Sequence, residues 1–153
     1  MKTLTKLHPV TKYAIEAVTG KRVVGETERL ACQRHLNDLA RAGQLPAGVK
    51  VKLKVKHQKD YPWRFDEAKA DRIIKFFTYL RHVEGLFAGQ PIKLIDAHKF
   101  DLGCIFGWVN AKNKMRRFKK AYLQVGKKNA KTTLLAGVDN YMMVGDGEES
   151  PRV

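Results

Sequence analysis

Helical periodicity recurs along this sequence and is clearest between residues 66 and 82. Four apolar residues there are spaced i, i+3, i+4 and i+7, namely Ile73, Phe76, Phe77 and Leu80. That spacing puts all four side chains on one face of an α-helix. Asp66 is a typical N-cap before the run, and Arg81 and His82 follow it, where the helix dipole favours cations. The pattern predicts a helix whose aromatic residues belong to a protein core.

The same reasoning predicts helices over four other segments, 9–18, 26–42, 94–108 and 131–144. Pro9 suits the first turn of a helix, and Gly20 and Gly43 supply the left-handed residues that end the first two helices. Residues 118–125 differ, because Ala121, Leu123 and Val125 alternate with other residues. This period of two predicts a strand.

Residues 49–56 alternate apolar residues with lysines in strict succession. The alternation is typical of a strand with one apolar and one cationic face. It is equally typical of an exposed arm whose lysines keep it in solution, because a single run of this length has no partner strand to confirm it. Both interpretations stay open from the sequence.

The length and composition fit one small domain or a part of something larger. Of 153 residues, 44% are hydrophobic and 29% are charged, which excludes collagen-like and low-complexity chains. No apolar run approaches the roughly 20 residues of a membrane span, and the N-terminus lacks a secretory signal. Cys32 and Cys104 lie far apart and form no CxxC pair. We therefore expect a cytoplasmic protein without a disulfide or zinc scaffold.

The charge balance points to a polyanionic partner. Thirty Lys and Arg residues against 15 Asp and Glu residues give a formal net charge of +15. Such an excess favours nucleic acid first and an anionic membrane second, although a basic surface also serves solubility alone. A basic run without acids between residues 112 and 131 predicts contacts with DNA phosphates, and its alternative is a solvated face. The DNA-binding candidates are Arg116, Arg117, Lys119 and Lys120.

Residues 126–133 lie between the predicted strand and the last predicted helix. Their composition is typical of a phosphate-binding loop: Gly126, Lys127, Lys128, Asn129, Ala130, Lys131, Thr132 and Thr133. Such a loop needs backbone N–H groups around the phosphates, a lysine for the β and γ oxygens, a hydroxyl for magnesium and a helix N-terminus directed at the anion. Lys131, Thr132 and the helix after them meet these demands.

The loop departs from GxxxxGK[ST] in two ways. Three residues rather than four separate Gly126 from Ala130, and Ala130 stands where glycine is usual. Alanine adds a Cβ where positive φ is often required. The alternative interpretation is a basic turn between a strand and a helix, because short motifs match by accident.

Six further groups of residues extend the pattern along the chain. They are Leu7-His8-Pro9-Val10 with Tyr13, Arg29-Leu30-Ala31-Cys32-Gln33-Arg34-His35-Leu36, Phe76-Phe77 with Leu80-Arg81-His82, Gly89-Gln90-Pro91, Ile105-Phe106-Gly107-Trp108, and Arg116-Arg117-Phe118 leading into the loop. In their order and approximate spacing, the chain from about Leu7 onward resembles the N-terminal part of the large subunit of a tailed-phage terminase. An ordered series of strings is far more specific than the loop alone.

This resemblance implies an ATP-driven motor that threads double-stranded DNA into a procapsid, with a nuclease that cuts concatemers. The implied cofactors are ATP and Mg²⁺. The implied partners are DNA, the terminase small subunit and the portal, with no membrane.

The resemblance also implies roles for single residues. Lys131 would contact the β and γ phosphates and Thr132 would hold magnesium. Lys127 would be catalytic, because the family often has an arginine there that stabilises charge at the γ phosphate, and lysine keeps the charge without the guanidinium fork. His98 stands where the family has a glutamine associated with adenine recognition. The other ATP-binding residues would be Gly126, Lys128, Asn129, Ala130 and Thr133.

The implied fold class is α/β, with a mainly helical N-terminal region followed by the first strand–P-loop–helix unit of a P-loop NTPase. We expect the helical region over 1–92 and an incomplete ATPase domain over 93–153. The family's Walker B acids and nuclease would lie beyond Val153, so we expect a truncated chain that is inactive alone. Two alternatives stay open: a basic helical nucleic-acid-binding module without ATPase activity, and a non-functional prophage remnant. The expected location is the cytoplasm of a bacterial host.

Overall fold

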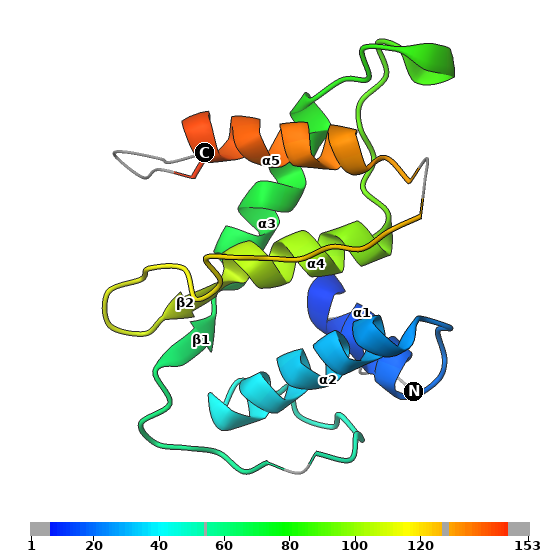
Figure 1. Cartoon of the computed structure of the whole chain (residues 1–153). Coiled ribbons are helices and arrows are strands. Elements are labelled where there is room, and N and C mark those ends of the chain that lie inside the picture. Colours follow the sequence, from blue (N-terminus) through cyan, green and yellow to red (C-terminus); the bar gives the residue numbers. More distant parts are fainter. Residues whose placement is uncertain (1–6, 54, 127–128, 147–153) are drawn as a thin grey trace.

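The computed structural model describes residues 7–53, 55–126 and 129–146. Within these residues the chain is mainly helical, with one two-stranded sheet. The elements are α1 (Pro9–Val18), α2 (Glu26–Arg41), β1 (Trp63–Phe65), α3 (Glu67–Phe76), the 3-10 turns η2 (Phe77–Tyr79) and η3 (Gly85–Phe87), α4 (Asp96–Gly107), β2 (Trp108–Asn110) and α5 (Lys131–Val144). Figure 1 shows the α1–α2 hairpin on one side of α4 and α5 on the other.

The predicted helices are confirmed, with small changes at their ends. α3 begins after Asp66, whose side chain accepts a hydrogen bond from the backbone N–H of Lys69 at 3.1 Å. It ends earlier than the sequence suggests, because η2 follows directly and Leu80 is already extended. Gly20 and Gly43 have positive φ angles of 74° and 68°. Both glycines therefore end helices in the left-handed conformation that was expected.

α4 is the centre of the fold and contacts both α1 and α3. A Cβ atom on Gly103 would lie 2.4 Å from Cγ2 of Val10, and one on Gly107 would lie 2.6 Å from Cε2 of Phe65. Neither distance is possible for a real side chain, so glycine at both positions allows α4 to approach α1 and β1. The two glycines, which weaken an isolated helix, are therefore needed for the packing of α4 in the core.

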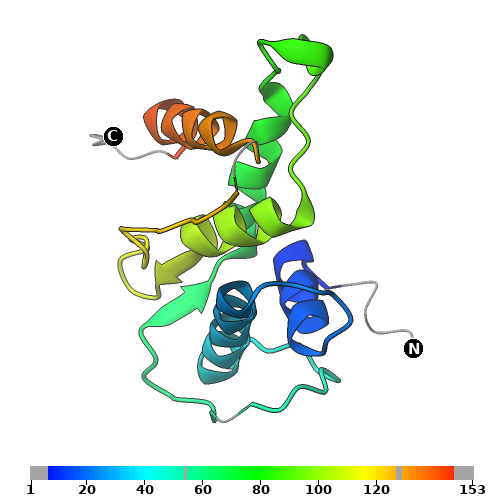
Figure 2. The same ribbon diagram turned by 45° about the vertical axis from the view of Figure 1, so that its right-hand side comes forward.

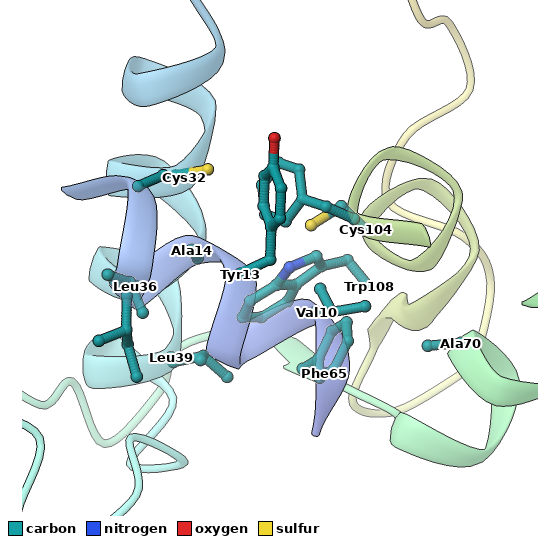
Figure 3. Packing of buried hydrophobic residues seen from close by; sticks show 13 residues of the cluster. Val10, Tyr13, Ala14, Cys32, Leu36, Leu39, Phe65, Ala70, Cys104 and Trp108 are labelled. Carbon is teal, nitrogen blue, oxygen red and sulfur yellow. The ribbon is translucent and has the colours of Figure 1, made fainter. Parts of the chain in front are cut away.

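Two apolar clusters fill the interior on the two sides of α4. The first lies against α1 and α2, and Figure 3 shows its side chains, including Tyr13, Phe65 and Trp108, meeting between the helices. The second lies against α5 and contains Ile73, Phe77, Leu102, Phe106, Leu134 and Tyr141. Since α4 contributes to both clusters, the regions 1–92 and 93–153 pack against each other. Their division into two domains stays a prediction.

The small sheet joins β1 and β2 in antiparallel pairing, with Phe65 opposite Trp108. At the outer edge of β1, one side chain forms the hydrogen bonds that a neighbouring strand would otherwise provide. Gln44 accepts a hydrogen bond from the backbone N–H of Phe65 at 2.7 Å and donates one to its carbonyl oxygen at 2.8 Å. A glutamine thus takes the place of a third strand, because buried backbone groups require a partner.

The strand predicted over 118–125 is wrong. Residues 118–126 form an extended segment that runs along α4 in both views of the molecule (Figures 1 and 2). No other strand pairs with this segment among the described residues. A strand exists only through its ladder, so the alternating pattern alone is not sufficient. The expected strand–P-loop–helix unit is therefore present only as an extended segment and a helix.

Residues 49–53 and 55–56 are likewise extended without a strand partner in the described part of the chain. Val49, Val51 and Leu53 are partly buried and pack against the first apolar cluster. Lys50, Lys52 and Lys56 are exposed. The segment therefore has the two faces expected of a strand and the unpaired backbone expected of an arm. Among the described residues, no helix is long and apolar enough to cross a membrane.

Candidate nucleotide-binding site

The N-terminus of α5 has no side-chain cap. Its N-cap residue is Ala130, at φ 51° and ψ 23°, and the side chain of Asn129 donates to the carbonyl oxygen of Gly126 at 3.2 Å rather than to the helix. The first N–H groups of any α-helix lack intrahelical partners. The first turn of α5 contains no acidic residue. Unpaired N–H groups and the positive end of the helix dipole would favour an anion here.

The side chains of the first turn are accessible to such an anion. Lys131 and Thr132 are exposed and Thr133 is half-buried. Lys131 takes part in no ion pair among the described residues. Lys127 and Lys128 lie outside the described residues. The arrangement provides a cation and a hydroxyl beside the unpaired N–H groups, which is the donor set that phosphate requires.

Packing on α3 and α4 fixes the direction of α5. A Cβ atom on Gly137 would lie 2.4 Å from Cε1 of Phe77, so the helix backbone sits directly on that ring. Tyr141 is buried and meets Phe106 and Phe76 edge-on, with ring centroids 5.1 Å and 5.3 Å apart. Leu134, near the start of the helix, is also buried in the second cluster, so α5 is held against the core along its length.

A groove of about 520 Å³ lies between α4, α5 and the extended segment. Its apolar residues include Leu102, Phe106, Leu134, Leu135 and Val138, and its basic residues are Arg116, Lys119 and Lys120. None of the described loop residues lines it. The groove therefore lies beside α5 and is separate from the predicted phosphate site at the N-terminus of α5.

The region from α4 to α5 matches a known family. The family model described as terminase large subunit, ATPase domain, matches residues 96–152. The chain resembles the terminase large subunit. The match begins at the start of α4 and includes the loop and α5, and it indicates a component of a phage DNA-packaging motor. No curated protein and no solved structure matches the chain.

Within the terminase-like region, His98 is not joined to the loop. It lies in the first turns of α4 and is half-buried, and this burial lowers the pKa of its imidazole. Among the described residues, no hydrogen bond links His98 to Gly126 or to residues 129–133. Its expected role in adenine recognition stays a prediction.

The basic residues of the terminase-like region divide into two kinds. Arg117 is half-buried and its guanidinium lies 5.0 Å from the ring centroid of Phe118 and 5.6 Å from that of Trp108. Arg116 forms an ion pair with Asp146 at 3.5 Å and is also half-buried. Lys119 and Lys120 are exposed. The two lysines are thus accessible to DNA, whereas the two arginines contribute to the packing of the fold.

Sequence reasoning did not find the buried partner of Arg117. Nη1 of Arg117 lies 2.6 Å from Oδ2 of Asp38, whose side chain is 1% exposed. The available signal was an acid next to the apolar face of α2, because Asp38 is between Leu36 and Leu39, both of which are buried. An acid in that position requires a partner, but the sequence does not reveal which one.

A second polar residue, His35, is also buried on α2. Trp108 donates its indole N–H to Nδ1 of His35 at 3.0 Å, so Nε2 carries the ring proton and donates to Oγ1 of Thr11 at 3.3 Å. Burial lowers the pKa of His35 to about 3, and the ring stays neutral. Both nitrogens are occupied, and no group of three His, Cys, Asp or Glu residues suited to a metal ion occurs in the described ranges.

Proposed function

We propose that this chain is part of the ATP-driven motor that packages phage DNA, and that the N-terminus of α5 binds the phosphates of ATP. The observation that carries the proposal is the uncapped start of α5 within the residues that match the terminase ATPase domain. Its position directly after the loop that the family resemblance identified supports this interpretation.

The donor set suits ATP and Mg²⁺. The N–H groups of Lys131, Thr132 and Thr133, together with the Lys131 ammonium, would hold the phosphates, and the Thr132 hydroxyl would face the metal. Bound Mg²⁺ neutralises charge on the β and γ phosphates. Lys127 is proposed as the residue that stabilises charge at the γ phosphate, and Lys128 as a further phosphate contact.

In the complete motor, residues 93–153 would be the start of the ATPase domain and residues 1–92 a helical region in front of it. The proposed partners are double-stranded DNA, the terminase small subunit and the portal. Lys119 and Lys120 are the proposed DNA contacts that the fold leaves accessible. The ion pairs of Arg116 and Arg117 direct these two residues toward the protein itself.

Titration with a fluorescent ATP analogue in Mg²⁺ buffer tests the nucleotide site. We expect saturable binding by the parent chain and at least tenfold weaker binding by Lys131→Ala. The matched control is Lys93→Ala, another exposed lysine, which is expected to change the dissociation constant less than twofold. Equal weakening by both substitutions would mean that the net charge, not the start of α5, attracts the analogue.

One observation favours a second function, a nucleic-acid-binding module that does not use ATP. Residues 118–126 have no strand partner among the described residues, whereas a P-loop requires a strand before it. The net charge of +15 would serve DNA binding without a nucleotide. Salt-dependent DNA binding that is indifferent to Lys131→Ala, in a chain that binds no ATP analogue, would support this second function.

A further inference from the structure

The segment that connects α2 to β1 carries a row of exposed lysines on the surface of the N-terminal hairpin. We call Lys50, Lys52 and Lys56 the lysine ribbon; Lys54 lies outside the described residues. All three are exposed, and Val49, Val51 and Leu53 between and beside them pack against the first apolar cluster. Alternate residues of an extended chain point to opposite sides. Burial of the valines and the leucine therefore holds the lysines outward.

The spacing of the ribbon suits a phosphate backbone. Residues two apart in an extended chain are separated by about 7 Å, which is comparable to the distance between successive phosphates along one strand of a nucleic acid. A lysine ammonium on its flexible stem binds a phosphate as a point charge and needs no fixed angle. Lys50 and Lys52 can therefore contact neighbouring phosphates without a change in the protein backbone, and Lys56, four residues after Lys52, would contact a phosphate further along.

No internal acid neutralises the ribbon. Residues 49–59 contain no Asp or Glu. Within the described part of the chain, Lys50, Lys52 and Lys56 form no ion pair. Their charges are thus available to an external anion, and counterions held near them would be released when a phosphate binds.

The end of the ribbon is anchored to α2. The backbone N–H of Gln58 donates to the carbonyl oxygen of Arg41 at 2.9 Å, and Nδ1 of His57 lies 3.0 Å from the same oxygen. The His57 ring also rests on Gly43, where a Cβ would lie 3.0 Å from Nδ1. An anchored segment loses less conformational entropy on binding than a free arm does.

We propose that the lysine ribbon binds the sugar–phosphate backbone of double-stranded DNA. Residues 49–59 contain no Phe, Tyr or Trp, so they lack the aromatic platforms on which single-stranded bases stack. The apolar side chains face the core, so the ribbon also lacks the exposed apolar face with which a peptide enters a membrane interface. The ribbon lies outside the matched residues 96–152 and is independent of the proposed nucleotide site.

The test measures the fluorescence anisotropy of a short labelled duplex of mixed sequence with the full chain. The ribbon variant replaces Lys50, Lys52 and Lys56 with glutamine. The matched control replaces Lys21, Lys75 and Lys93, which are also exposed but scattered over the surface. Both variants lower the net charge by three. A third variant, with arginine at the three ribbon positions, keeps the charge.

We expect the ribbon variant to bind at least tenfold more weakly, with the slope of log affinity against log salt reduced by about 2.7 between about 50 and 200 mM salt. The control and arginine variants should stay within about threefold of the parent. Equal weakening by the ribbon and control variants would overturn the proposal, since net charge alone would then explain it. A ribbon variant that no longer binds phosphatidylserine vesicles but still binds DNA like the parent would overturn the proposal in favour of a membrane.

Two further measurements separate this proposal from other failures. The thermal unfolding midpoint of the ribbon variant should equal that of the parent, because the substituted side chains are exposed. Lys131→Ala removes one charge outside the ribbon, at the proposed nucleotide site, and should weaken DNA binding less than the ribbon variant does. DNA binding that is lost in Lys131→Ala and retained in the ribbon variant would contradict the ribbon and place the DNA surface at α5.

Discussion

Nη1 of Arg117 lies 2.6 Å from Oδ2 of Asp38, which joins the segment after β2 to the last turn of α2 across 79 residues of sequence. The other carboxylate oxygen of Asp38 accepts hydrogen bonds from the Tyr61 hydroxyl at 2.6 Å and from Arg41 at 2.9 Å. This buried network connects the N-terminal hairpin to the terminase-like region. Movement of one part relative to the other would require the network to break.

The network makes Arg117 a stability determinant. Arg117→Met would leave Oδ2 of Asp38 buried without its partner, while Arg41 would still pair with the other oxygen. Leaving one oxygen of a buried charged group unsatisfied costs about 1 to 3 kcal/mol. Urea unfolding measures the loss. Lys119→Met removes the same charge from an exposed position two residues later, and it should change the free energy of unfolding by less than about 0.5 kcal/mol. Equal effects of the two substitutions would contradict this role.

His35 should make the chain less stable in mild acid. Its pKa is about 3 in the folded protein and about 6.5 in the unfolded chain. Between these values the unfolded chain binds a proton that the folded protein does not, so stability falls as the pH falls from 6.5 toward 3. From pH 7 to pH 5 this contribution is about 2 kcal/mol.

Comparison with His35→Gln isolates this effect. Asp101 acts in the opposite direction, because burial and the nearby Glu28 raise its pKa to about 7, and its contribution to stability is lost as the pH rises from about 4 toward 7. Asp101 is present in both proteins, so its effect cancels in the comparison. Urea unfolding at pH 7 and pH 5 should therefore show a change in the free energy of unfolding that is about 2 kcal/mol more unfavourable in the parent than in His35→Gln. An equal loss in both proteins would show that His35 is protonated in the folded state.

Ala130 holds the left-handed conformation at the start of α5, with φ 51°. An L-residue with a Cβ is strained there by roughly 1 to 2 kcal/mol, and glycine is not. Ala130→Gly should therefore stabilise the protein by about 1 kcal/mol in urea unfolding. Ala136→Gly, at an exposed position inside the same helix, should destabilise it by about 1 kcal/mol. If both substitutions changed the free energy of unfolding in the same direction, a left-handed Ala130 would be excluded.

Gly137 should not tolerate alanine, although alanine is the better helix former. The added Cβ would lie 2.4 Å from Cε1 of Phe77 and 2.5 Å from Cζ. Relief of this overlap requires α5 to move away from α3, at a cost of about 1 to 3 kcal/mol. Thermal unfolding of Gly137→Ala measures the loss. A double variant with Phe77→Leu should recover part of it, and no recovery would mean that the contact is not the cause.

The helices could be predicted because their signal is local. The spacing of Ile73, Phe76 and Phe77 is sufficient to define one apolar face of α3 and the start of η2. The glycines at 20 and 43 end their helices wherever the rest of the chain lies. The strand over 118–125 could not be predicted in this way. Its alternation is real, but a strand depends on a neighbour that the described residues do not provide.

For the candidate site and its surroundings, the local features were likewise predicted and the long-range contacts were not. The start of α5 at Lys131 and the need for positive φ at position 130 follow from short-range patterns, and the structure has both. The ion pair between Arg117 and Asp38 joins residues that are distant in sequence, so no local pattern reveals it. The same holds for Gln44, which replaces a strand at the edge of β1.

Thermal unfolding of the purified chain with and without Mg-ATP tests the nucleotide site most directly. Binding to the folded state alone at 100 times the dissociation constant adds about 2.7 kcal/mol of stability, which for a chain of this length raises the midpoint by about 5 to 10 °C. We expect this rise in the parent and its loss in Lys131→Ala. A parent chain that unfolds cooperatively at the same temperature with and without Mg-ATP would contradict the proposed binding of ATP at the start of α5.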